Sequence, residues 1–485
     1  DPYTTTVALQ SLIEAPDLIS ADQISQLLSH DSVDVRAAAL DLIQSGGEKS
    51  LLPFIVENLA DSKTVLKARS ALKHFDETEA ISALAEKSRS GIPEDLSCAI
   101  LNTLKHYPGA GSAMVTSEMM DRSNPQIYRE SVDTLLSIAR NTPLPNALLE
   151  DLEDETRFIA ELAYQHSIAL DFFHDDSKSS LMEDHLNHKL ALLRPVLLKL
   201  GVLDQPETRV ETYIHTLQSN DSGRLGFVLE LLEQIFTVEE REIINPLIEP
   251  MDISDRVLIG RNFFPDLPKD KNYFIIKGIH SGNDWTAALY LNLIFNSGDD
   301  KILSEIDWEK VNPSNLIKEV ISLHSIKNGK DYSGKIPESL VLKKEELPMY
   351  STIEKTILLK SVSLFQSIPS EDLSRIAQIA EEVHFDSGES IFKAGEFGDS
   401  MYIIMNGSVK IHLEDQPIAT LDKGECLGEM ALLDQDPRSA DATVEENVIL
   451  LKISGDAFYE IMSGNMDIMQ GIVKLLTSRL RSAIQ

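Results

Sequence analysis

The sequence is poor in cysteine, with only Cys98 and Cys426 among its 485 residues. Because these two lie more than three hundred positions apart, a disulfide framework and a cysteine-ligated zinc site are both excluded. Long apolar runs are also lacking: the longest, residues 190–203, contains Arg194 and Lys199, whereas a membrane-spanning helix needs about 20 apolar residues. These absences favour a reducing compartment, and we expect a cytoplasmic location, which includes the cytoplasmic face of a membrane protein.

Positive charge is scarce as well. Lys and Arg number 44 against 78 Asp and Glu, so the net charge is −34. A field of this sign repels DNA, RNA and anionic membranes, and no basic patch interrupts it, so a nucleic-acid partner is not expected. The chain begins at Asp1 without an initiator Met or a signal peptide, which suggests processing or a piece of a longer polypeptide.

Residues 1–330 carry the periodicity of helices. Apolar residues recur at three- and four-residue spacing, as in Ile24, Leu27 and Leu28, and short polar turns return about every 20 residues. Two helices therefore make a unit of about 40 residues, the length of a HEAT or armadillo repeat. Residues 30–40 resemble the HEAT turn and second helix, with an acid or Ser expected to cap the turn, and residues 60–68 and 121–129 are weaker copies. We predict a HEAT-like helical solenoid, with a non-repetitive helical domain as the alternative.

The helical periodicity is lost towards the end of the chain. Residues 331–350 contain Gly334, Pro337 and Pro348 and predict a linker or irregular bridge. Residues 351–485 predict a second domain, a β-barrel or jelly roll with flanking helices at about 351–362 and 466–484. Short β-like runs, separated by glycine turns, lie at 390–393, 401–404, 409–413, 418–421 and 448–453.

One segment of this second domain, residues 427–440, carries the chemistry. Gly428 and Glu429 open a short helical turn, and Arg438 follows Glu429 by nine residues, directly after Pro437. The start of a helix presents free N–H groups to an anion, and an Arg can add a paired contact to a phosphate. The Glu is then an acceptor for a neighbouring hydroxyl, and a cyclic ribose phosphate displays both groups together.

Residues 351–485 resemble a cyclic nucleotide-binding domain, the module shared by catabolite activators, cyclic-nucleotide-dependent kinase regulators and gated channels. The turn 395–409 is similar to the family's turn between early strands, and 428–440 is similar to its phosphate-binding cassette. The resemblance implies that cyclic AMP (cAMP), or with lower preference cyclic GMP (cGMP), binds at the cassette. The implied binding residues are Gly428, Glu429, Met430, Ala431, Leu432, Arg438 and Ser439.

The resemblance also implies individual roles in this cassette. Arg438 and the backbone N–H of Ala431 would hold the phosphate, and Glu429 would accept the ribose 2′-hydroxyl beside Gly428. Ser439 could add a phosphate contact. Leu427 stands where the family more usually has Phe, a departure that concerns packing. The final helix is expected to close over the bound base as a lid.

Two functions of different class remain open. In the first, the protein is a regulatory cyclic nucleotide sensor whose solenoid passes occupancy to a protein partner. Helical repeats followed by this domain resemble the cytoplasmic part of bacterial transporters similar to ATP/ADP carriers, so that partner would be a membrane transporter. In the second, the chain is a non-signalling HEAT-repeat scaffold with a structural barrel.

No residue pattern supports an enzyme. The kinase motifs H-R-D and D-F-G are absent, and no Ser or Cys nucleophile has a visible base partner. His174, Asp184, His185 and His188 are spaced as metal ligands could be, but solvated helix ends explain them better, and we expect no metal.

Overall fold

The computed structural model describes residues 2–11, 19–43, 48–174, 180–218, 225–298, 301–330, 332, 334–362, 365–366, 368–414, 416–429, 436–456, 458–459, 469 and 473. Packing divides the chain into two compact units, described separately below. Unit 1 comprises Asp1–Tyr164 with Leu190–Pro265, and unit 2 comprises Gln165–Lys189 with Asp266–Gln485. No helix within the described ranges is long and apolar enough to cross a membrane.

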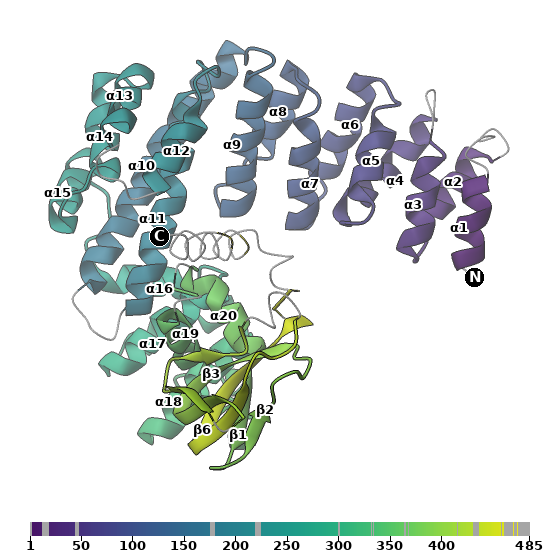
Figure 1. Ribbon diagram of the computed structural model, residues 1–485. Helices are drawn as coiled ribbons and strands as arrows, with labels where there is room; N and C mark the ends of the chain where they lie inside the picture. Colours follow the sequence, from purple (N-terminus) through teal and green to yellow (C-terminus); the bar gives the residue numbers. More distant parts are fainter. Residues whose placement is uncertain are drawn as a thin grey trace. The chain divides into compact units, whose positions relative to one another are not determined.

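Unit 1 is helical, and Figure 1 shows α1 to α9 side by side in chain order. Contacts join α1 and α2 to α3, α3 to α5, α4 to α6, α6 to α8, and α7 and α8 to α9. The helices are α1 (Pro2–Ser11), α2 (Ala21–Leu28), α3 (Val33–Asp41), α4 (Leu52–Glu57), α5 (Val65–Leu72), α6 (Glu77–Ser88), α7 (Glu94–Leu104), α8 (Ala110–Glu118), α9 (Pro125–Ala139), α10 (Asn146–Phe173), α11 (Ser180–Gly201), α12 (Val210–Gln218), α13 (Leu225–Ile235), α14 (Val238–Ile248) and α15 (Ile253–Phe263). The 3-10 turns Lys49–Leu51 and Asn58–Ala60 flank α4. The α10 and α11 helices each continue into unit 2.

Polar side chains fix where these helices begin. Ser20 caps α2 and forms a capping box with Gln23, and Asn124 caps α9 just before Pro125. The cap expected at the start of α3 is not made, because the Ser32 side chain does not bond to the helix. Instead the Ser32 N–H donates to Nδ1 of His30 at 2.9 Å.

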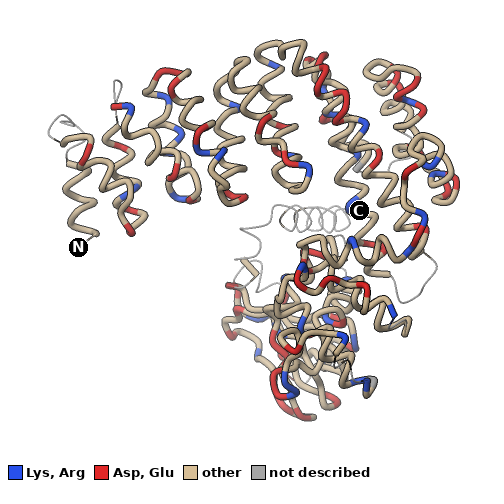
Figure 2. The backbone as a smooth tube through the Cα atoms, turned by 180° about the vertical axis from the view of Figure 1, so that it is seen from behind, with Lys and Arg blue, Asp and Glu red and all other residues tan. Residues whose placement is uncertain are grey.

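Ion pairs join separate helical segments of unit 1. Lys87 pairs with Glu57 at 2.8 Å, Lys105 with Glu130 at 2.6 Å and Arg122 with Glu155 at 2.8 Å. Figure 2 shows basic residues interspersed among the acidic ones along these helices. Each half-exposed pair contributes only about 0–1 kcal/mol, so the buried Leu, Ile and Ala side chains between the helices carry the stability.

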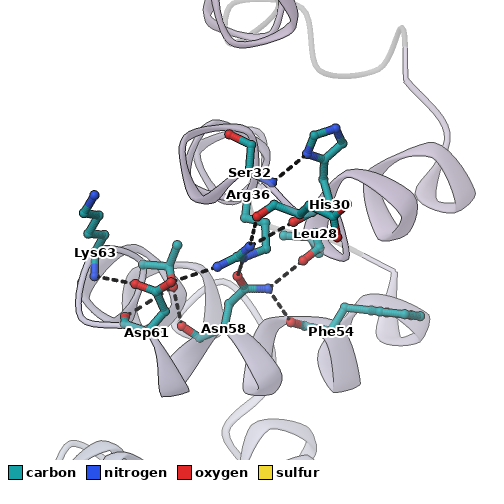
Figure 3. A network of polar contacts seen from close by, with 10 residues as sticks. Leu28, His30, Ser32, Arg36, Phe54, Asn58, Asp61 and Lys63 are labelled. Atoms are coloured by element: carbon teal, nitrogen blue, oxygen red, sulfur yellow. Dashed lines mark hydrogen bonds and ion pairs between the residues drawn. The ribbon is translucent and has the colours of Figure 1, made fainter. Parts of the chain in front are cut away.

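Arg36 of α3 forms hydrogen bonds with several neighbouring segments of unit 1 (Figure 3). Its Nε donates to Asn58 at 3.0 Å, one Nη to the carbonyls of His30 and Asp31, and the other Nη to Asp61 at 2.8 Å. Asn58 in turn donates to the carbonyls of residues 28 and 54. The predicted repeat segments 30–40 and 60–68 are therefore tied together, although a HEAT-like solenoid stays a prediction.

Unit 2 combines helices with an antiparallel sheet. Its further helices are α16 (Lys271–Ile279), α17 (Asp284–Ser297), α18 (Asn315–Asn328), α19 (Thr352–Ser361) and α20 (Ser370–Ile379). The strands are β1 (Glu381–Phe385), β2 (Ser390–Phe392), β3 (Ser400–Leu413), β4 (Gln416–Leu421), β5 (Cys426–Leu427) and β6 (Asp441–Ser454). They pair in the order β1-β6-β3-β4, with β2 also on β6 and β5 also on β3. Closure into a barrel or jelly roll stays a prediction.

The alternating residues of β3 separate two cores. Met401, Ile403 and Met405 pack with α19 and α20, whereas Ile404 and Val409 belong to a second apolar cluster on the opposite face. Leu427 and residues of β6 complete that second cluster. The helices therefore cover one face of the sheet and leave the other for the site described below.

Several local expectations differ from the structure. The runs predicted at 401–404 and 409–413 form one strand, because Gly407 adopts a φ of +85° at an irregularity in the pairing with β6. The β1 strand was not predicted, since its sequence EEVHF is largely polar. In α19, Ile353 and Leu358 are buried, whereas Ile357 is 50% exposed.

The bridge between the predicted domains is packed rather than open. Within 331–350, the 3-10 turns Glu338–Leu340 and Lys344–Glu346 form, and Ile336 and Leu340 are buried. The backbone N–H of Leu342 donates to Ser322 of α18 at 2.8 Å. The helix predicted at 466–484, with its apolar residues Ile468, Ile472, Leu475, Leu476 and Leu480, lies outside the described residues.

Candidate functional site

The predicted cassette lies between β5 and β6. Gly428 and Glu429 directly follow β5, and Arg438 and Ser439 come shortly before β6. The predicted binding residues Met430, Ala431 and Leu432, together with Leu433, lie outside the described residues. The structure thus brings four of the seven predicted residues, Gly428, Glu429, Arg438 and Ser439, to the rim of one cavity.

Arg438 is the centre of this site, and its side chain is turned into the protein. It is 6% exposed and donates through Nη1 to the carbonyl of Gly428 at 2.9 Å and through Nη2 to that of Ser400 at 2.6 Å. The main chain holds it in place, because its N–H donates to Glu396 and its carbonyl accepts from Gly395, both at 2.8 Å. No carboxylate of the described residues reaches ion-pair distance of Arg438.

Two glycines make room for this guanidinium. A Cβ at Gly398 would overlap Nε and Cζ of Arg438, and a Cβ at Gly428 would overlap Nη1. Gly428 also has a φ of +77°, which L side chains rarely adopt. Glycine is therefore required at both positions for the guanidinium of Arg438 to fit.

The buried guanidinium leaves one donor unsatisfied. Within the described part of the chain, Nε of Arg438 has no hydrogen-bond partner although it is buried. Burial lowers the pKa of Arg438, while the nearby acids Asp399, Glu396 and Glu429 act in the opposite direction. A buried, charged N–H without an acceptor is costly, so this geometry points to an anionic acceptor supplied from outside.

A cavity of about 410 Å³ opens beside Arg438. Phe392, Ile411, Ala419, Leu421 and Leu427 form its apolar wall. Glu429, Asp436, Arg438 and Ser439 supply its polar end. The volume lies in the range of small-molecule sites, and the arrangement suits a ligand with a flat apolar part and an anionic part.

Sequence reasoning missed some members of this cavity. Phe392 and the β4 residues Ala419 and Leu421 lie in short strands whose sequences carry no sign of a ligand wall. The Ser400 carbonyl that accepts from Arg438 is a backbone group, and no side-chain pattern reveals it. Cys426 also lines the cavity as a half-buried residue.

A second polar cluster joins α20 to α11 and α17 within unit 2. Glu371 of α20 accepts from Asn283, the N-cap residue of α17, at 2.6 Å, and from Lys189 of α11 at 3.3 Å. Asp184 of α11 accepts from the N–H of Ser370 at 3.1 Å and pairs with Lys360 of α19 at 2.8 Å. These contacts fix both helices that cover the sheet.

His185 lies inside this second cluster with its side chain 2% exposed. Its Nε2 lies 2.9 Å from Oγ1 of Thr286, which already donates to Asn283, so Nε2 carries the proton. Nδ1 then faces Glu371 at 3.8 Å without a hydrogen bond. Burial lowers the pKa of His185, Lys189 acts the same way and Glu371 opposes it. Asp184 and His185 thus hold helices together, and the described residues contain no cluster of three metal ligands.

Comparison with known proteins identifies the domain around this cavity. The cyclic nucleotide-binding domain family matches residues 382–465. Mouse cGMP-dependent protein kinase 2 is 38% identical over 119 residues, which is 23% of this chain and 16% of that kinase. A cAMP-dependent protein kinase regulatory subunit of Emericella nidulans is 30% identical over 114 residues, 23% of this chain and 28% of that protein. The chain thus spans less than a third of the length of these relatives.

Solved structures are similar to about a quarter of this chain. A cyclic nucleotide-binding-like protein from Brucella abortus is 31% identical, with 22% of this chain and 97% of that chain covered and a TM-score of 0.22. The regulatory domain of Toxoplasma gondii PKA with cAMP is 24% identical, with 23% and 44% covered and a TM-score of 0.22. Residues 382–465 are a cyclic nucleotide-binding domain.

Proposed function

We propose that this protein is a non-enzymatic cyclic nucleotide sensor whose helical region transmits ligand occupancy to a partner. The observation that carries the proposal is that Arg438, whose buried Nε–H has no acceptor, lines the polar end of a cavity with an apolar wall. A cyclic nucleotide matches both parts, since its phosphate is an acceptor for Arg438 and its base is flat and largely apolar on its faces.

The ligand we propose is cAMP in preference to cGMP. In this assignment Arg438 and the backbone N–H of Ala431 hold the phosphate, Glu429 accepts the ribose hydroxyl beside Gly428, and Ser439 adds a phosphate contact. The cavity wall of Ile411, Ala419 and Leu421 offers dispersion contacts to either base and no hydrogen bond, which gives guanine no advantage.

Calorimetric titration with cAMP and cGMP tests the proposal. We expect saturable binding of one nucleotide per chain below millimolar concentration, with cAMP at least as tight as cGMP. An absence of heat for both ligands would leave the structural scaffold as the better account. A cGMP affinity ten times higher than that for cAMP would overturn only the base preference.

We further propose that HEAT-like stacking makes residues 1–330 the transmitting part. Two observations support this: ion pairs and the Arg36 network tie successive helical segments together, and Glu371 and Asp184 tie α19 and α20 to α11 and α17. The partner in this proposal is a membrane transporter domain, on the same or another polypeptide. A gene sequence with hydrophobic spans ahead of Asp1 would support the first arrangement.

Hydrogen exchange tests the transmission step. We expect cAMP to change amide protection in α17 and in residues 180–189 of the wild-type protein. Glu371→Ala removes the acceptor for Asn283 and Lys189, so it should abolish that change while cAMP still binds. Glu381→Ala is the matched control, because this exposed strand residue makes only a distant pair with Lys452. If Glu371→Ala leaves the response intact, this route is wrong.

A further inference from the structure

The ring of Phe392 lies against the guanidinium of Arg438. Cζ of Arg438 is 4.3 Å from the ring centroid, a distance typical of a cation–π contact. Phe392 is the last residue of β2, where it pairs with Ala442 of β6. The small side chain of Ala442 leaves space beside the ring. Arg438 precedes β6 by only a few residues.

The main chain makes this stacking a fixed feature. Backbone bonds from Gly395 to Arg438 and from Arg438 to Glu396 hold the loop after β2 against the arginine. On the other side, Tyr402 of β3 lies near the ring, with centroids 6.3 Å apart and planes tilted by 32°. The ring of Phe392 thus contacts Arg438 and Tyr402 and has little freedom to leave.

Stacking and hydrogen bonding use different parts of a guanidinium. The ring lies under Cζ of Arg438, whereas the N–H groups of a guanidinium point outward within its own plane. In that plane, Nη1 and Nη2 already donate to the carbonyls of Gly428 and Ser400, and Nε remains unsatisfied. Phe392 therefore does not compete with an incoming anion, and it restricts the orientation in which the free Nε–H is held.

We propose that Phe392 is a positioning residue that holds Arg438 ready for the phosphate of the ligand. This inference rests on the proposed function. The ring stabilises a desolvated cation before the ligand binds and so reduces the reorganisation that binding requires. An aliphatic side chain at position 392 would fill the wall of the cavity but would leave the guanidinium without this support.

The test compares two ligands, cAMP and adenosine, on the wild-type protein and three variants. Phe392→Leu keeps an apolar side chain and removes the ring, whereas Phe392→Tyr keeps the ring. Ile391→Val is the matched control, since Ile391 is the neighbouring half-buried residue of β2 and packs in the second apolar cluster. Affinities are measured by calorimetry for cAMP and by competition for adenosine, which has the base and sugar but no phosphate.

We expect Phe392→Leu to weaken cAMP binding about 5- to 30-fold, the range of a desolvated cation–π contact. Adenosine binding should change by less than about twofold, and Phe392→Tyr and Ile391→Val should bind cAMP as the wild type does. Equal losses for cAMP and adenosine would make Phe392 a base wall and overturn the positioning role, as would an unchanged affinity for cAMP. A wild-type protein that binds no cyclic nucleotide would instead overturn the proposed function.

Discussion

Arg36 in unit 1 and Arg438 in unit 2 are both largely buried arginines, and they differ in which groups accept their hydrogen bonds. The side chain of Arg36 finds two side-chain acceptors, Asn58 and Asp61, and two carbonyls, so the chain itself meets its hydrogen-bonding needs. Arg438 finds two carbonyls, no carboxylate within the described ranges, and keeps a buried Nε–H without a partner. The first arrangement holds helices together, and the second is suited to an anion that arrives from solution.

The largest expected effect comes from removing the side chain of each arginine in turn. Arg438→Ala should weaken cAMP binding about 30- to several-thousand-fold, because truncating one partner of a buried charge pair costs about 2–5 kcal/mol. Calorimetry measures the affinity, and thermal unfolding without ligand checks that the domain stays folded. Arg36→Ala is the control and should bind cAMP normally. An Arg438→Ala protein within threefold of the wild-type affinity would contradict the assignment.

A subtler change displaces Arg438 without removing it. Gly398→Ala places a Cβ where the guanidinium lies, and overpacking of this kind costs about 1–3 kcal/mol, so cAMP affinity should fall about 5- to 100-fold. Gly388→Ala is the matched control: Gly388 has a φ of +88° with open space around it. That variant should be strained by about 1 kcal/mol and still bind cAMP. Equal affinities for the two variants would show that the space left by Gly398 is unimportant for the position of Arg438.

Arg36→Ala should act on stability alone. It leaves Asn58 and Asp61 without their shared donor, and an unsatisfied buried polar group costs about 1–3 kcal/mol. Denaturant unfolding should therefore show unit 1 destabilised by about that amount. Arg89→Ala is the control, because its pair with Glu118 is mostly exposed and should matter far less. Equal losses for the two variants would remove the structural role given to Arg36.

The smallest expected effect concerns pH. Burial lowers the pKa of His185 below its usual 6.5, with Lys189, His166 and His188 acting in the same direction and Glu371 opposing. The unfolded chain then binds more protons below pH 6.5, so the free energy of unfolding falls on acidification. The lowered pKa of Glu371, held down by Lys189 against its burial, adds a further loss below about its usual 4.5.

His185→Gln tests this dependence, because Gln can keep the bond to Thr286 and cannot take up a proton. Unfolding measured between pH 7 and pH 5 should become less steep with pH in this variant than in the wild type. A wild-type stability that rises on acidification over this range would contradict the sign.

The sequence predicted the parts of the site that depend on local spacing. Glu429 and Arg438 lie within one segment. Glycine turns between short β-like runs indicated a β-rich domain. The remaining parts depend on pairings between distant positions. Phe392 meets Arg438 only because β2 pairs with β6, and Glu371 meets Lys189 across 182 positions. The polar strand β1 gave no apolar alternation, and Gly407 looked like a turn although the strand continues through it.

The central claim is that the free donor of Arg438 receives the phosphate of a cyclic nucleotide. The most direct measurement is the NMR signal of the Arg438 Nε–H, assigned by its loss in Arg438→Lys, during titration with cAMP. The account predicts that this signal shifts and becomes protected from solvent exchange in step with calorimetric saturation, whereas the Arg36 Nε–H signal stays unchanged. Saturation with cAMP while the Arg438 signal keeps its position and exchange rate would contradict the account.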